Sequence, residues 1–175
     1  MQGLVHIYTG DGKGKTTAAV GLGLRAWGRG RKVLMVQFLK GKESGELIAI
    51  DRLGDGFVVN RGKYMGKFTW SMNEEERKQT AVLQRQQLEY AWKEMKTDRW
   101  DMLILDEIMA AVTTEMVPLK DVLALIGDKP DRLELVMTGR NAPDPLIEVA
   151  DYVSEIREVK HPLQKGIAAR RGIED

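Results

Sequence analysis

The sequence contains no cysteine, which excludes a disulfide framework, a thiolate metal site and a cysteine nucleophile. It also lacks any apolar run that approaches the roughly 18 residues of a membrane span, and its first residues do not resemble a signal peptide. We therefore expect a cytoplasmic location and no membrane partner.

An excess of charge of either sign is missing too. Lys and Arg total 27 and Asp and Glu total 26, so the formal net charge is +1. This balance gives no electrostatic reason to expect a nucleic acid or a membrane surface as a partner. A chain of 175 residues has the size of one domain, and no repeat, low-complexity segment or linker divides it. We expect a single domain over residues 1–175.

A glycine-rich segment stands out near the start of the chain. Residues 9–17, with the sequence TGDGKGKTT, follow an apolar run at 4–8 that is typical of a buried strand, and a helical pattern follows at 18–27. A strand, a glycine-rich turn and a helix in this order are typical of a Walker A phosphate-binding loop. The standard pattern has glycine at the position of Thr9, so only the end at 14–16 matches strictly. A flexible surface loop is the alternative, which the flanking strand and helix disfavour.

The residue types in this loop suit the binding of phosphate. Gly10, Gly12 and Gly14 allow a positive φ, so that backbone N–H groups can converge on an anion. The positive end of the following helix points to the same place. Lys15 is expected to reach the terminal phosphates, and the hydroxyl of Thr16 is expected to bind Mg²⁺. The sequence therefore predicts a site for a nucleoside triphosphate.

Strand and helix patterns alternate along the rest of the chain. Apolar runs predict strands at 32–38, 57–59, 101–107, 133–137 and 152–156, and helical patterns lie at 46–53, 73–96, 118–126 and 143–150. This alternation indicates an α/β fold with a parallel sheet, in which ligands bind at the carboxyl edge. One face of the helix at 73–96 is expected in the core; its residues are Leu88, Ala91, Trp92 and Met95.

The run at 101–107 ends in two acids, Asp106 and Glu107, as a Walker B strand does. Hydrophobic residues followed by Asp-Glu are common, but downstream of a phosphate-binding loop they indicate a carboxylate that serves Mg²⁺ directly or through water. The pattern does not decide which of the two acids contacts the ion. If the strand continues, their side chains point in opposite directions and have different functions.

Three further segments bear on the site. Arg140 follows the strand predicted at 133–137 and is either a phosphate clamp or a surface charge. Residues 61–70 show neither helical nor strand period and contain three aromatic residues, three basic residues and two glycines. They form either a loop that packs its aromatics onto the core or a mobile lid that offers a platform to a flat apolar ligand. The polar tail at 160–175 is either loosely ordered or packed over the site.

Taken in order, these motifs resemble those of the P-loop type of ATP:corrinoid adenosyltransferase, the family that makes adenosylcobalamin. The resemblance covers essentially the whole chain, and its segments are 10–18 (GDGKGKTTA), 36–41 (VQFLKG), 68–70 (FTW), 105–107 (LDE), 138–140 (TGR) and 159–161 (VKH). The first and fourth occur in many nucleotide-binding proteins, whereas the second and third in this order are much more particular. The resemblance implies a three-layer RecA-like P-loop NTPase fold with a mostly parallel central sheet flanked by helices.

The resemblance also implies a reaction. Co(I) of a reduced corrinoid attacks the 5′ carbon of Mg-ATP and expels triphosphate, whose developing charge the loop and Lys15 are suited to hold. Phe68 and Trp70 are implied to lie on the lower face of the corrin and to displace its axial ligand, which makes Co(II) easier to reduce. The implied metal ligands are Thr16, Glu107 and Asp106. The implied nucleotide-binding residues are Gly10, Asp11, Gly12, Lys13, Gly14, Lys15, Thr16, Thr17 and Arg140.

By the same resemblance, the expected partners are ATP, the reduced corrinoid and an electron-donating reductase or flavoprotein, and a homodimer is expected. Two features depart from the family pattern. Some members carry a helical extension before the first strand that helps to cover the active site of a partner subunit, whereas here the strand begins almost at Met1. Lys67 lies between Gly66 and the aromatic pair, where relatives commonly have the glycine adjacent.

Two other functions are open from the residues alone. A small-molecule kinase or NTPase that cleaves the γ-phosphate usually has an arginine-rich lid, and only Arg140 and Arg157 lie near suitable positions. A non-catalytic nucleotide-binding switch needs no site for a flat ligand, and it leaves Phe68 and Trp70 unexplained. The phosphate product separates the three functions, because only the adenosyltransferase releases triphosphate.

Overall fold

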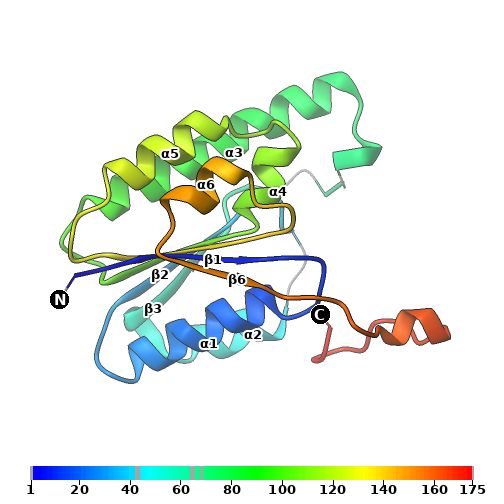
Figure 1. Ribbon diagram of the computed structural model, residues 1–175, viewed down its shortest axis with the longest axis horizontal. Helices are drawn as coiled ribbons and strands as arrows, with labels where there is room; N and C mark the ends of the chain where they lie inside the picture. The colour runs from blue at the N-terminus through cyan, green and yellow to red at the C-terminus, as the bar shows by residue number, and fades with distance from the viewer. Residues whose placement is uncertain (1, 42–43, 64–65, 68, 175) are drawn as a thin grey trace.

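The computed structural model describes residues 2–41, 44–63, 66–67 and 69–174. Within these residues, six strands form one sheet in the order β3-β2-β4-β5-β1-β6, and every neighbouring pair is parallel (Figure 1). The strands are β1 (Val5–Thr9), β2 (Val33–Gln37), β3 (Phe57–Asn60), β4 (Met102–Asp106), β5 (Glu134–Thr138) and β6 (Tyr152–Glu155). The strands predicted from the apolar runs are confirmed, with small shifts at their ends.

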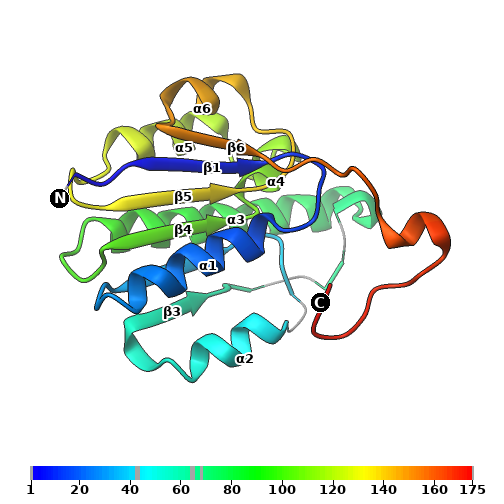
Figure 2. The same ribbon diagram turned by 60° about the horizontal axis from the view of Figure 1, so that its bottom comes forward.

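Helices cover both faces of the sheet and give the molecule three layers (Figures 1 and 2). One face carries α1 (Lys15–Trp27) and α2 (Gly45–Asp51). The other face carries α3 (Glu74–Met95), α4 (Ile108–Thr113), α5 (Leu119–Gly127) and α6 (Asp144–Val149). The predicted three-layer α/β architecture is therefore confirmed. None of the helices within the described residues is both long enough and apolar enough to span a membrane.

The central strands are apolar throughout because both faces of the sheet are covered. All residues of β2 and β4 are buried. Leu34 and Leu103 belong to the cluster that packs against α3 and α5, whereas Met35 and Ile104 belong to the cluster that packs against α1. Burial of each large apolar side chain contributes roughly 1.5–3 kcal/mol, so these two clusters dominate the stability of the sheet.

The order of the strands brings particular residues together at the carboxyl edge. β5 lies between β1 and β4, so its end is flanked by the glycine-rich loop and by the acidic end of β4. Gln37 is opposite Asp106 in the register of β2 and β4. Leu105 is opposite Met137, which places Asp106 beside Thr138. Polar residues from three neighbouring strands therefore meet where the apolar runs end.

The helices differ from the sequence predictions in two places. α1 begins at Lys15 rather than at residue 18, because the left-handed turn at Gly14 leads the backbone directly into the helix. The sequence pattern does not predict α4, because its six residues are too few to show a helical period. Glu107, with a φ of 62°, ends the strand and starts α4.

The buried face predicted for α3 is largely confirmed. Leu88, Ala91 and Met95 are buried in the core. Trp92 is only half-buried, and its indole N–H donates a hydrogen bond of 3.0 Å to a carboxylate oxygen of Asp128. It therefore lies at the rim of the core, where its ring packs and its N–H reaches a polar partner.

Candidate functional site

The glycine-rich loop connects β1 to α1 at the carboxyl edge of the sheet (Figure 2). Gly10 and Gly14 have φ angles of 96° and 119°, which favour glycine as predicted. Gly12 has no positive φ, and this corrects the prediction for that residue. A Cβ atom at Gly12 would lie 2.8 Å from the carbonyl carbon of Arg157. The backbone N–H of Gly12 donates a hydrogen bond of 2.8 Å to the carbonyl of Ile156. Gly12 is thus required by the close approach of the chain after β6.

Lys15 lies against the loop that precedes it. Its ammonium donates hydrogen bonds of 2.7 Å to the carbonyls of Gly10 and Gly12, and the residue is only 8% exposed. Burial lowers the pKa of Lys15, and the charge of Arg140 lowers it further. Phosphate oxygens form stronger, charge-assisted hydrogen bonds with an ammonium than carbonyls do. An anion in the loop would therefore be a better partner for Lys15 than the carbonyls are.

The first turn of α1 faces the same place. Lys15, Thr16 and Thr17 form this turn, and no side-chain cap occupies its N–H groups within the described residues. The first N–H groups of a helix have no partner inside the helix and carry the positive end of its dipole. Lys13 and Thr17 are exposed, and Thr16 is half-buried. The arrangement suits the binding of phosphate.

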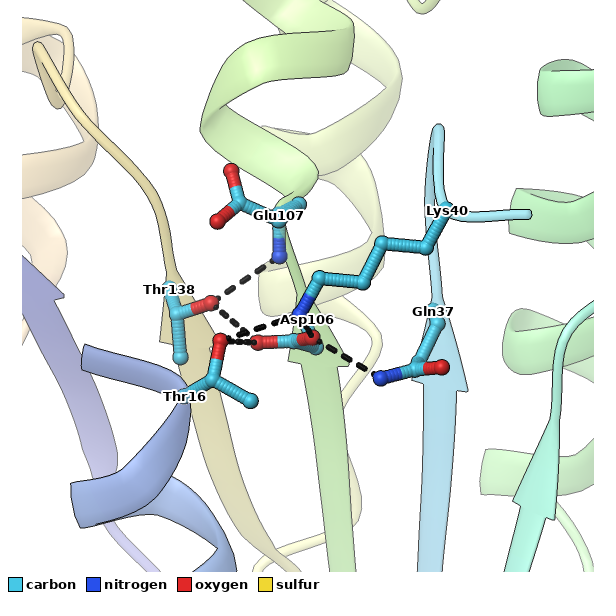
Figure 3. Close-up of polar contacts among 6 residues, drawn as sticks. All are labelled: Thr16, Gln37, Lys40, Asp106, Glu107 and Thr138. Atoms are coloured by element: carbon cyan, nitrogen blue, oxygen red, sulfur yellow. Dashed lines mark hydrogen bonds and ion pairs between the residues drawn. The ribbon is translucent and has the colours of Figure 1, made fainter. Parts of the chain in front are cut away.

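Asp106 is the centre of the polar cluster (Figure 3). It is 0% exposed and accepts four hydrogen bonds. The hydroxyls of Thr16 and Thr138 donate to Oδ1 at 2.8 and 2.7 Å. The amide of Gln37 and the ammonium of Lys40 donate to Oδ2 at 3.1 and 2.6 Å. A carboxylate offers about four acceptor positions, so the acceptor capacity of Asp106 is fully used.

Lys40 reaches Asp106 from the turn that follows β2. Its Nζ atom also donates to Oγ1 of Thr16 at 3.1 Å. Leu39, which precedes it, has a φ of 51°, a left-handed conformation that costs a non-glycine residue about 1–2 kcal/mol. The N–H of Leu39 donates to the side-chain oxygen of Gln84 at 3.0 Å. This turn directs Lys40 back over the strand ends (Figure 3).

Glu107 has different surroundings from Asp106, although the two are adjacent in the chain. Its backbone N–H donates to Oγ1 of Thr138 at 2.9 Å, while its carboxylate points away from the cluster (Figure 3). Burial raises the pKa of Glu107, and the charge of Asp106 raises it further. The two acidic side chains diverge because the backbone at Glu107 is left-handed, not because the strand continues.

The oxygens of the cluster fit a divalent cation. Mg²⁺ takes oxygen ligands at about 2.0–2.1 Å, so two adjacent ligands of its octahedron lie about 3.0 Å apart. Oγ1 of Thr16 and Oδ1 of Asp106 are 2.8 Å apart. The ammonium of Lys40 already places a positive charge against these two residues. The residues present can therefore hold Mg²⁺ together with phosphate oxygens and water.

Arg140 lies at the surface near the glycine-rich loop. Its Nη2 atom is 3.4 Å from the carbonyl oxygen of Asp11, and both residues are exposed. An open pocket of about 500 Å³ is lined by Asp11, Arg140, Glu155, Arg157 and Glu158. The charge of Arg140 contributes to the lowered pKa of Lys15. Arg140 thus lies at the surface beside the glycine-rich loop, where its side chain can reach a ligand bound in the loop.

Trp70 lies on a short 3₁₀ helix (Thr69–Ser71) and is 80% exposed. Of the two interpretations of this segment, packing onto the core is therefore wrong for Trp70. Phe68, the other aromatic candidate, lies outside the described residues.

The described part of this segment is attached to the start of α3. Lys67 forms an ion pair with Glu76, which also makes a capping box with Asn73. The guanidinium of Arg77 donates to the backbone carbonyls of Thr69 and Thr114 at 3.4 and 3.1 Å. Lys67, which departs from the family pattern, thus joins the segment to α3.

The polar tail lies beyond β6, at the carboxyl edge of the sheet (Figure 2). A short 3₁₀ helix (Pro162–Lys165) interrupts it. Hydrogen bonds from Arg170 lower the pKa of Glu174 to about 2, and the charge of Lys13 in the glycine-rich loop adds to this effect. The end of the tail therefore lies on the side of the molecule that carries the site.

Three members of the cluster have no role that the sequence pattern alone assigns, namely Gln37, Lys40 and Thr138. Thr138 is the last residue of a buried run, as Gln37 is. A polar residue at the end of a buried parallel strand is the signal that points to such positions. The role of Lys40 depends on the left-handed turn at Leu39, which no short pattern predicts.

Comparison with known proteins agrees with this geometry. The sequence matches the protein family described as ATP:corrinoid adenosyltransferase BtuR/CobO/CobP over residues 1–174. It is similar to the corrinoid adenosyltransferase of Escherichia coli strain K12, with 36% identity over 174 residues that cover 99% of this chain and 86% of that protein.

Two further relatives give the same result. The chain is 35% identical over 178 residues to the corrinoid adenosyltransferase CobA of Salmonella typhimurium strain LT2, covering 99% of this chain and 86% of that protein. It is 35% identical over 179 residues to the corrinoid adenosyltransferase of Pseudomonas aeruginosa, covering 99% and 84%.

Proposed function

The chain belongs to the ATP:corrinoid adenosyltransferase family BtuR/CobO/CobP, and on this basis we propose how its carboxyl edge serves the reaction. The enzyme transfers the 5′-deoxyadenosyl group of ATP to the Co(I) centre of a reduced corrinoid and releases triphosphate. The observation that carries this conclusion is the family match over residues 1–174. The alternative of a kinase or NTPase that cleaves the γ-phosphate receives no support from the comparisons.

The reaction breaks the bond between C5′ and the α-phosphate oxygen. The cobalt supplies the electron pair for the new Co–C bond, and the pair of the broken bond leaves with the triphosphate. Negative charge therefore develops on the leaving oxygen, where aligned N–H groups and a lysine stabilise it. We assign this function to the glycine-rich loop, the first turn of α1 and Lys15. Lys15 exchanges its two carbonyl partners for phosphate oxygens, and Arg140 is the surface clamp.

Thr16 is the proposed direct ligand of Mg²⁺, and Asp106 holds its hydroxyl in place. This assignment is supported by the 2.8 Å contact between the two side chains and by the complete burial of Asp106. Glu107, whose carboxylate points elsewhere, is a second candidate ligand. Mg²⁺ bound to the hydroxyl of Thr16 would neutralise charge on the leaving triphosphate.

Trp70 and Phe68 are proposed to contact the corrin macrocycle. A large aromatic side chain that is 80% exposed keeps its apolar surface in water, and a flat apolar ligand would cover it. The described part of this segment is attached to α3 by the ion pair between Lys67 and Glu76. This ion pair and the hydrogen bond from Arg77 to the carbonyl of Thr69 fix the backbone next to Trp70 relative to α3.

Several broader assignments belong to this proposal. Residues 1–175 act as one nucleotide-binding and corrinoid-adenosylating domain, which the single sheet running through the described strands supports. A homodimer, an electron-donating reductase or flavoprotein, and a cytoplasmic location complete it. The reductase is needed because the nucleophile is Co(I), which must be generated from Co(II).

Identification of the phosphate product tests the proposal. Mg-ATP and chemically reduced corrinoid are supplied under anaerobic conditions, and the phosphate species are separated. We expect triphosphate and an adenosylated corrinoid in equal amounts. Release of ADP with inorganic phosphate or a phosphoester would support the kinase or NTPase instead, and unchanged ATP would indicate a non-catalytic nucleotide-binding protein.

A further inference from the structure

The ammonium of Lys40 lies where the proposed metal site needs a cation. It is 2.6 Å from Oδ2 of Asp106 and 3.1 Å from Oγ1 of Thr16 (Figure 3). The hydroxyl of Thr16 donates its hydrogen to Oδ1 of Asp106. Its remaining lone pairs are what a metal ligand must offer, and one of them accepts from Lys40.

An ammonium and a divalent cation cannot occupy this place together. Lys40 takes one of the two lone pairs of the Thr16 hydroxyl, and a divalent cation on the other would lie within a few ångström of the ammonium, where their like charges repel each other. Without metal, Lys40 is one of the four donors that use the two oxygens of Asp106. Binding of Mg²⁺ to the hydroxyl of Thr16 therefore displaces Lys40 from this pair.

The surroundings of the pair show which partner can move. The side chain of Asp106 is 0% exposed, whereas that of Lys40 is 31% exposed. Lys40 has a flexible four-carbon stem with a route to water, and its ammonium regains full hydration there. Asp106 has neither. The left-handed turn at Leu39, whose N–H donates to Gln84, directs the backbone of Lys40 toward the site.

We propose that Lys40 is an internal counter-ion of the nucleotide-free enzyme, which occupies the cation position on Thr16 and Asp106 and yields it when the metal nucleotide binds. The proposal rests on the proposed function, because that function places Mg-ATP in this loop. Lys40 keeps the buried Asp106 neutralised before the metal arrives. It also allows metal-free ATP to approach without meeting an uncompensated carboxylate.

The test compares ATP binding with and without metal in wild type and Lys40→Met. Isothermal titration gives the Kd of ATP in excess MgCl₂ and in excess EDTA, and the quantity compared is the ratio of the EDTA value to the Mg²⁺ value. In Lys40→Met, metal-free ATP meets the bare charge of Asp106, while Mg-ATP no longer has to displace an ammonium. Both effects raise the ratio, and we expect an increase of about tenfold or more over wild type.

The ratio separates this role from a plain phosphate contact. If Lys40 only contacted phosphate, Lys40→Met would weaken the affinities for ATP with and without Mg²⁺ equally. The ratio would then be unchanged, and this result would overturn the proposal. An unchanged pair of affinities would overturn it as well. Lys40→Arg keeps the charge and should retain a ratio near that of wild type. Lys120→Met, a substitution at an exposed position of α5, is the matched control.

Stability in the absence of nucleotide provides a second readout. Lys40→Met in EDTA leaves Asp106 without its cation, and its Tm should fall by at least about 4 °C while that of Lys120→Met stays unchanged. If Lys40→Met does not fold, Lys40→Gln, which keeps a hydrogen-bond donor but no charge, replaces it in both measurements. Failure of wild type to bind ATP at all would remove the proposed function, whereas intact binding with an unchanged ratio would remove only the role of Lys40.

Discussion

Both edges of the sheet are rich in polar side chains, but those at the amino edge bind the chain to itself. Lys129 and Arg132 donate hydrogen bonds of 2.7 to 3.3 Å to backbone carbonyls of the segments that precede the strands, namely Gly3, Pro130, Leu133, Trp100 and Thr97. Asp101 and Asp151 accept from the N–H groups of Lys32 and Val5. These charged groups are hydrogen-bond partners of backbone atoms at this edge.

The carboxyl edge has the same residue types in a different arrangement. Among the described residues, three of the four non-glycine residues with positive φ follow a strand at this edge, namely Leu39, Glu107 and Asn141. The pKa of Lys15 is lowered and that of Glu107 is raised, chiefly by burial. Strained backbone and perturbed pKa values cluster at functional sites.

The difference between the edges lies in what the charges contact. At the amino edge a lysine is held by carbonyls in the interior of turns, and no ligand is needed to complete it. At the carboxyl edge a metal nucleotide would replace the carbonyl partners of Lys15 and would displace Lys40 from Thr16 and Asp106. We therefore expect substitutions at the amino edge to change stability alone, and those at the carboxyl edge to change nucleotide binding or turnover whether or not they also change stability.

The largest effect is expected for Lys15→Ala. Loss of the ammonium removes a direct partner of the leaving triphosphate, so adenosylation should fall by about 10²–10³-fold or more. The Tm of the nucleotide-free protein should change little, because the cost of burying the Lys15 ammonium offsets its two hydrogen bonds to loop carbonyls. Triphosphate release from Mg-ATP with chemically reduced corrinoid measures the rate. Turnover close to that of wild type would contradict the assignment of Lys15, and with it the claim that the carboxyl edge carries the chemistry.

Lys129→Met is the corresponding change at the amino edge. It removes the donor of three carbonyls and should cost about 1–3 kcal/mol of stability. For a chain of this size, that corresponds to a fall in Tm of about 2–4 °C per kcal/mol. Thermal unfolding measures the shift, and Lys120→Met is the control. The rate per folded molecule at a temperature below both transitions should equal that of wild type; a selective loss of rate would contradict a purely structural role.

Trp70→Ala should produce a smaller and more specific change. The exposed ring contributes little to the fold, so Tm and ATP affinity should remain as in wild type. Adenosylation that starts from Co(II) and a reductant should slow by on the order of tenfold, the equivalent of about 1.4 kcal/mol. The same variant supplied with preformed Co(I) serves as its own control. Equal rates from both starting states, matching wild type, would show that the aromatic segment is assigned wrongly.

The smallest effect is expected at Asp128, which lies at the amino edge. The hydrogen bond from Lys96, and then that from Trp92, lowers the pKa of the Asp128 carboxyl. A carboxyl group whose pKa is lower in the folded state stabilises the fold at a pH above its unfolded-state pKa. This stabilisation is lost as the pH falls through the folded-state pKa. Asp128→Asn should therefore lower the Tm slightly at pH 7, by less than about 2 °C, and not at all at a pH well below the folded-state pKa of Asp128. A constant difference across the pH range would exclude this ion pair as its source.

Much of the fold could be predicted from the sequence, because buried parallel strands leave continuous apolar runs. The six runs and the glycine-rich loop were enough to place Lys15, Thr16 and Asp106 at one edge of one sheet. The capped start of α3 is also a local signal, carried by Asn73 and Glu76.

The remaining features depend on contacts between distant parts of the chain. Gly12 is required by Arg157, which is remote in sequence, so loop composition alone suggested the wrong reason for it. α4 directly follows the two acids that end β4, and the left-handed backbone at Glu107 starts it. Lys40 turns toward Asp106 through the contact of Leu39 with Gln84 on α3. No pattern in the sequence records such contacts.

A crystal structure with Mg-ATP, in the absence of reduced corrinoid, tests the central claim most directly. We predict the triphosphate along residues 12–17, the metal on the hydroxyl of Thr16, and the ammonium of Lys40 moved away from Asp106. A nucleotide bound elsewhere, or Lys40 still bonded to Asp106 beside the bound Mg-ATP, would contradict the account.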